Sequence, residues 1–141
     1  MKKSLLIVIL VTVLIAIAAA CSSKRSNVSN GTAIKTVTVD SLTATLSSGT
    51  GQLKQGDQEV TLAFTDSSGK PVDVGAVSLN FHMPAMGGMA AMNDAVTFTT
   101  TNTPGVYRGK VNIGMAGEWQ AQLAYEGTAG KGKTTFSVTA R

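Results

Sequence analysis

The residues most suited to binding a ligand are methionines, and most of them lie in one short segment. Residues 81–94 read FHMPAMGGMAAMND. This segment holds four of the five methionines that follow the initiator: Met83, Met86, Met89 and Met92. The fifth is Met115, and the only histidine of the chain, His82, adjoins the first methionine of the segment.

Thioether sulfur is a soft, neutral ligand that suits Cu(I) better than Zn²⁺, Ca²⁺ or Mg²⁺, and an imidazole adds affinity for copper. Gly87 and Gly88 let the segment fold back, so that several sulfurs can converge on one point. The pattern predicts a Cu(I) site with these ligands: His82, Met83, Met86, Met89 and Met115. Met92 is expected to be peripheral because it nears the following strand.

A packing interpretation competes with the metal site. Methionine is a flexible core filler, and a spacing of three also fits one face of a helical turn. The paired glycines and Pro84 weigh against a helix. By strand alternation His82 lies on the opposite face from Phe81, so it is equally well explained as a solvated residue at a strand end.

The elements that must position these residues are strands. Helical periodicity is absent after residue 35, while period-2 alternation and turn clusters recur at short intervals, which predicts a single immunoglobulin-like antiparallel β-sandwich. About seven strands are expected: 36–46, 59–65, 76–82, 95–100, 106–113, 118–125 and 133–139. The apolar phase slips between Val39 and Leu42, which suggests a bulge or bend in the first of them. Tyr107 and Trp119 are expected to face the core.

The order of these strands brings Met115 toward the methionine segment. If successive strands alternate in direction, the connections after the third and fifth strands emerge at the same end of the sandwich. The segment 83–94 is the first of these connections, and the turn 114–117 is the second. A contact between them would serve a metal site, and it would equally seal the end of the sandwich.

The amino terminus predicts export. Lys2 and Lys3 precede an unbroken apolar run that ends in three alanines before Cys21, as in a lipoprotein signal. Residues 1–20 are therefore expected to be a signal peptide, Cys21 the lipid-modified first residue and 21–35 a flexible tether to a domain at 36–141. An uncleaved membrane anchor is the alternative, since the run is near the lower limit of about 17–25 residues for a membrane span. Either way the domain is expected in the cell envelope, on the extracytoplasmic side of a membrane.

The net charge and the counts of cysteine and histidine limit the classes of function that are expected. The formal charge of +4 falls to +2 once the two signal lysines are removed, so nucleic acid is not an expected partner. No second cysteine exists to form a disulfide with Cys21. A single histidine and the lack of a nucleophile motif around any serine give no basis for an enzyme.

Two stretches, FHMPAMGGM and PGVYRGKVNIGMAGEWQAQLAY, resemble the YtkA-like domain family, related to FixH-like proteins. The shared features are the MPxMG-type motif at 83–87, the G-x-Y strand at 105–107 and the Met–small–Gly–x–Trp turn at 115–119. The resemblance implies an immunoglobulin-like sandwich, often lipid-anchored, with links to copper handling or to maturation of membrane oxidases. Many members have histidine after the motif's last glycine. Here that place is Gly88, which leaves His82 as the only imidazole.

Two functions follow as hypotheses. One is a copper-binding accessory protein that holds Cu(I) for a partner such as a membrane oxidase or a metal-transport protein. The other is a non-metal interaction module of a membrane complex, in which the methionine loop is a packing or contact surface.

The first testable expectation concerns the anchor. The intact mass of the mature protein isolated from membranes should correspond to a chain that begins at an acylated Cys21. A mature protein that still begins at Met1 would refute cleavage and leave the membrane-anchor interpretation.

Overall fold

The computed structural model describes residues 31–141, and every regular element in that range is a β-strand. There are nine strands in chain order: β1 (Thr32–Val39), β2 (Leu42–Ser48), β3 (Gly56–Thr65), β4 (Ala76–Met83), β5 (Met92–Ala95), β6 (Thr97–Thr100), β7 (Val106–Ile113), β8 (Gly117–Gly127) and β9 (Gly130–Ala140). Over these residues no helix offers the length and apolar character that crossing a membrane requires. The expected signal peptide and Cys21 lie outside the described range.

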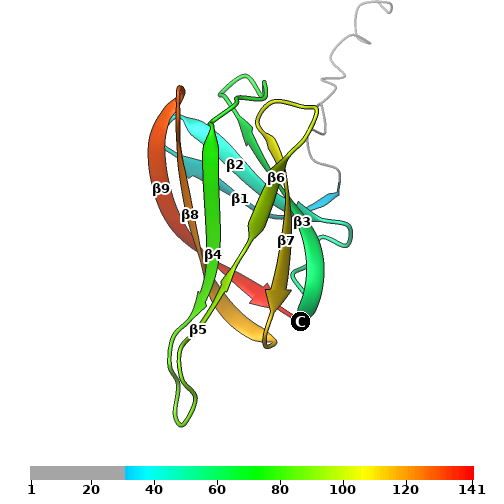
Figure 1. Ribbon diagram of the computed structural model, residues 1–141, viewed down its shortest axis with the longest axis vertical. Coiled ribbons are helices and arrows are strands. Elements are labelled where there is room, and N and C mark those ends of the chain that lie inside the picture. Colours follow the sequence, from blue (N-terminus) through cyan, green and yellow to red (C-terminus); the bar gives the residue numbers. More distant parts are fainter. Residues whose placement is uncertain (1–30) are drawn as a thin grey trace, which may run out of the picture.

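The strands form two antiparallel sheets that face each other (Figure 1). One has the order β1-β2-β3-β7-β6 and the other β5-β4-β8-β9. Apart from β1 and β5, this is the strand order of an immunoglobulin sandwich, with β2-β3-β7-β6 as A-B-E-D and β4-β8-β9 as C-F-G. The predicted fold class is therefore confirmed.

The first expected strand, 36–46, is two strands rather than one bent strand. The chain reverses between Val39 and Leu42, and β1 and β2 then pair as an antiparallel hairpin. Asp40 adopts a φ of 54° in this turn, a left-handed conformation that aspartate tolerates better than most residues. Strand β1 also begins at Thr32, so the last residues assigned to the tether pair with β2 in the sheet.

The expected strand 95–100 is also divided, because the chain changes sheets within it. Residues up to Ala95 pair with β4 in one sheet, and residues from Thr97 pair with β7 in the other. Between them Val96 is buried, and its N–H donates to the carbonyl of Leu79 (2.9 Å). The seven expected strands become nine by this division and by the added hairpin.

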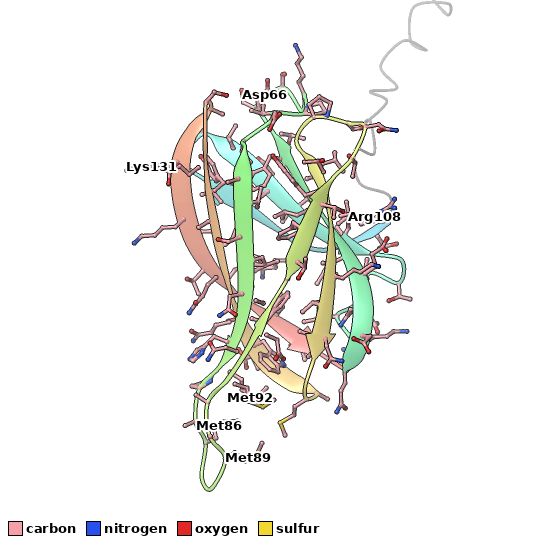
Figure 2. All side chains as sticks on the ribbon, viewed as in Figure 1. Asp66, Met86, Met89, Met92, Arg108 and Lys131 are labelled. Atoms are coloured by element: carbon pink, nitrogen blue, oxygen red, sulfur yellow. The ribbon has the colours of Figure 1, made fainter. Side chains whose placement is uncertain are left out.

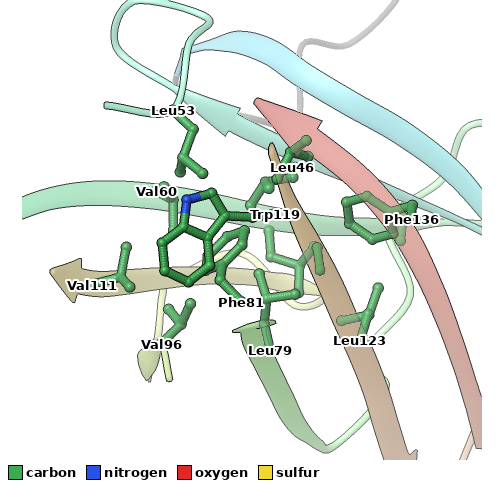
Figure 3. Close-up of a cluster of buried hydrophobic side chains, with 14 of the residues drawn as sticks. Leu46, Leu53, Val60, Leu79, Phe81, Val96, Val111, Trp119, Leu123 and Phe136 are labelled. Atoms are coloured by element: carbon green, nitrogen blue, oxygen red, sulfur yellow. The ribbon is translucent and has the colours of Figure 1, made fainter. Parts of the chain in front are cut away.

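The core lies between the sheets and is built from the inward residues of alternating strands. Trp119 is fully buried at its centre, surrounded by side chains of both sheets (Figure 3). Tyr107 is also buried, as expected. Alternation is clear on β8, where the inward residues are buried and the residues between them mostly exposed.

Two tyrosines tie loops to the sandwich with their hydroxyl groups. Tyr107 donates to Asp73 Oδ1 or to the Gly75 carbonyl, each at 3.1 Å. Tyr125 donates to Asp40 Oδ2 (3.3 Å), which fixes the β1–β2 turn. Burial, reinforced by the neighbouring carboxylate, raises the pKa of both phenols, so both stay protonated donors at neutral pH.

Removing the central side chain should test this arrangement. Trp119→Ala should lower the free energy of unfolding by about 3–5 kcal/mol, because it leaves a large cavity in the core. Chemical denaturation would measure the loss. Gln120→Ala, on the exposed face of the same strand, is the matched control and should change stability by less than about 0.5 kcal/mol. A similarly small loss for Trp119→Ala would contradict the assigned core.

Candidate functional site: the methionine hairpin

The methionine segment is the connection of a long hairpin between β4 and β5, at the end of the sandwich that also holds the β7–β8 turn (Figures 1 and 2). A hydrogen bond joins the β7–β8 turn to β5, next to the methionine connection: the Gly114 N–H donates to Asp94 Oδ2 at 2.9 Å. The predicted placement of both connections at one end is therefore confirmed.

The hairpin keeps one register from its base to its tip. Met83 pairs with Met92 at the end of the ladder, and Met86 pairs with Met89 in an isolated bridge nearer the tip. The N–H groups of Met86 and Met89 each donate to the other's carbonyl, at 3.2 and 2.9 Å. The turn between them is Gly87-Gly88, where only the first glycine has a positive φ, 55°, as in a type II′ turn.

The ladder is interrupted between these two pairs. Pro84 has no N–H to donate, and residues 84–85 and 90–91 lie outside the strands. Because the register is unchanged, alternation still assigns each residue to a face. Met83 and Met92 fall on the inner face, toward the core. His82 lies on the outer face, Met86 and Met89 have the same parity across the break in the ladder, and we call these three the outer group.

The inner methionines close the end of the core. Met83 is only 4% exposed, and Met92 and Met115 are half-buried and pack against the buried cluster. The methyl of Met92 lies so near Gly114 that a Cβ there would be 2.6 Å from it. We call Met83, Met92 and Met115 the inner group.

The β7–β8 turn is held against the same part of the core. The Met115 carbonyl accepts a hydrogen bond from Trp119 Nε1 at 3.0 Å. The methyl of Met83 lies 3.1 Å from the position that a Cβ on Gly117 would take. The inner group therefore has a packing role at the base of the hairpin.

The outer methionines are in the opposite situation. Met86 is 61% and Met89 44% exposed, and they are the only large hydrophobic side chains exposed among residues 31–141. All eight residues 84–91, PAMGGMAA, are exposed and none carries a charge. Burial of apolar surface is favourable. Contact between this exposed tip and a partner would therefore be favourable.

His82 lies partly exposed on the outer face of β4, as its alternation predicts. Its Nδ1 is 2.9 Å from Oδ1 of Asn93, the residue directly opposite on β5. Asn80 Nδ2 donates to the same oxygen at 3.3 Å. Asn93 was not among the residues singled out from the sequence, because its role depends on the pairing of β5 with β4.

The five expected metal ligands are thus divided between two faces. His82, Met86 and Met89 share the outer face of the hairpin, whereas Met83 and Met115 belong to the inner group. Met92, expected to be peripheral, lies beside the β7–β8 turn with that group. Within the described range no three His, Cys, Asp or Glu side chains are grouped to hold a metal ion. The soft ligands at this end are one imidazole and the thioethers.

Comparison with known proteins gives one result. The family model described as YtkA-like matches residues 36–124, which include the methionine hairpin and the β7–β8 turn. No curated protein and no solved structure matches the chain.

The division into two groups predicts selective oxidation. Peroxide converts exposed thioethers to sulfoxides, so brief treatment with dilute hydrogen peroxide should modify Met86 and Met89 several-fold faster than Met83. Tandem mass spectrometry of the digested protein locates each sulfoxide. In denaturant the rates should converge. Equal rates in the native protein would show that the tip is not exposed as described.

Proposed function

Given that the chain belongs to the YtkA-like family, we propose that this domain is a Cu(I)-binding accessory protein that takes up and passes on the ion at the tip of its methionine hairpin. The ion is cargo rather than a resident cofactor. We further propose that the domain works in the cell envelope, attached to the membrane through a lipid on Cys21.

The observation that carries the proposal is the exposure of Met86 and Met89 as a pair across the Gly87-Gly88 turn. Directly paired residues in an antiparallel ladder that exchange both hydrogen bonds have Cα atoms about 5.5 Å apart. Two flexible thioether side chains that start from such positions can reach one ion. Glycine in the turn adds no side chain to obstruct them.

His82 supplies the third donor in this proposal. It has the parity of the pair, and Met86 lies four positions further along the chain, which a fully extended backbone would span in about 13 Å. The two side chains must lean toward each other to bridge that span. We propose that the interruption of the ladder at Pro84 lets the tip bend toward the imidazole when the ion binds. One nitrogen and two sulfurs form a soft ligand set suited to Cu(I).

Exposure suits transfer as well as binding. A site made by an exposed hairpin can be approached by the ligands of a partner, such as a membrane oxidase under assembly or a metal-transport protein. The inner group has no such access, because Met83 is buried and its two neighbours pack against the core. We therefore assign the inner group to stability and the outer group to the ion.

A second candidate function is a metal-independent contact with a membrane complex. The eight uncharged, exposed residues 84–91 favour it, because methionine-rich surfaces adapt to different partners. The sulfur atoms themselves separate the two functions, since leucine preserves the apolar surface but cannot bind the ion.

Substituting the two groups separately tests the metal function. The double variant Met86→Leu, Met89→Leu should lower Cu(I) affinity by more than about 100-fold, because losing two direct ligands costs more than the 10–100-fold typical of an outer-shell partner. Competition with a Cu(I) chelator under reducing conditions measures the affinity. The matched control, Met92→Leu with Met115→Leu, should retain the wild-type affinity.

Three other outcomes would contradict the proposal in distinct ways. If wild-type protein binds no Cu(I), the contact function replaces the metal function. If the control variant alone loses the ion, the inner group is the site. If both variants bind like wild type, neither group provides the ligands.

A further inference from the structure

We infer that Asn93 is a positioning residue for His82: it holds the neutral imidazole as the Nδ1–H tautomer and leaves Nε2 as the free nitrogen donor on the outer face. The statement about the tautomer stands on the structure of the hairpin. Its consequence for Cu(I) rests on the proposed function.

The hydrogen-bond partners determine the tautomer. Oδ1 of Asn93 lies 2.9 Å from His82 Nδ1, and an amide oxygen can only accept. The same oxygen accepts from Asn80 Nδ2 at 3.3 Å, a second contact that agrees with the oxygen end of the Asn93 amide facing the ring. Nδ1 must therefore carry the hydrogen. In a neutral imidazole the other nitrogen then has the free lone pair.

The backbone holds these three residues in place. Asn93 is directly opposite His82 in the β4–β5 ladder, and Asn80 precedes the histidine by two residues on the same face. On its other side His82 pairs with Gln120 of β8. Strand β4 is thus held between two partners, so the imidazole extends from a fixed backbone although the hairpin tip beyond it is exposed.

The arrangement has the form of an outer-shell contact in metal sites. A histidine that binds a metal usually donates its second ring N–H to a carboxylate or carbonyl oxygen, which fixes both the tautomer and the ring orientation. Asn93 offers such an oxygen. A neutral amide also adds no charge near the ion, unlike the carboxylates that commonly take this position.

Nuclear magnetic resonance of the ring nitrogens tests the tautomer directly. His82 is the only histidine, so the full-length protein, made without a histidine tag, gives a single set of imidazole signals. At about pH 8, wild type should show a protonated Nδ1 and an unprotonated Nε2. Asn93→Leu should abolish this preference, and Asn93→Asp, which retains an acceptor oxygen, should restore it.

Two results would overturn the tautomer assignment: a protonated Nε2 in wild type, or an unchanged ring in Asn93→Leu. Asn112→Leu, which removes an exposed strand asparagine hydrogen-bonded to Asp57, is the matched control and should leave the signals as in wild type. None of these measurements involves copper.

Cu(I) affinity of the same variants tests the positioning role. Asn93→Leu should weaken binding by about 10–100-fold, the range found for outer-shell partners, while Asn93→Asp and Asn112→Leu should bind far more tightly than Asn93→Leu. An altered tautomer with unchanged affinity would refute the role of His82 as a ligand. Absence of Cu(I) binding in wild type would refute the proposed function and, with it, the positioning role, but not the tautomer.

Discussion

The strict alternation of side chains along the β4–β5 hairpin is the constraint on which the methionine segment depends. Neighbours on a strand point to opposite faces, so His82 and Met83 cannot act together although they adjoin in sequence. The core requires Met83, which is buried beneath the β7–β8 turn. Once that residue faces inward, the unchanged register sends Met86 and Met89 outward.

This separation gives one hairpin two physical roles. At its base, methionine acts as an adaptable apolar residue that fills the space between the sheets and the β7–β8 turn. At its tip, methionine is exposed, and packing within the domain does not explain its presence there. Pro84 lies at the boundary between these regions, because it ends the regular ladder. The chemistry of methionine is the same in both places, and its surroundings decide which property matters.

Much of the fold could be predicted from the sequence, because alternation reports burial directly. The inward positions of β8, led by Trp119, follow from period 2 alone, and the shared end of the two connections follows from counting strand reversals. The added β1–β2 hairpin precedes both connections, so it does not change their relation. The β1–β2 turn was missed because Asp40 adopts its left-handed conformation there, and no glycine in the sequence indicates a turn. The change of sheet at Val96 was missed because an apolar residue continues the alternation through it.

The site was predicted less completely, and the reason is pairing. Residue types indicated a soft ligand set, but a segment taken as an irregular loop has no faces to divide it. The pairing register of the hairpin defines these faces. Met86 and Met89 oppose each other only because the two glycines between them form the turn. Asn93 depends still more on pairing, as nothing in its local sequence relates it to His82 eleven positions earlier.

The two-residue turn also restricts how such a hairpin can change in length during evolution. Adding one residue to each arm preserves the turn and the pairing below it, yet it moves the methionine pair to the opposite face, away from the histidine. Adding two residues to each arm restores the face. Among hairpins with this turn, those that keep a sulfur pair beside the imidazole should therefore differ in length by multiples of four residues.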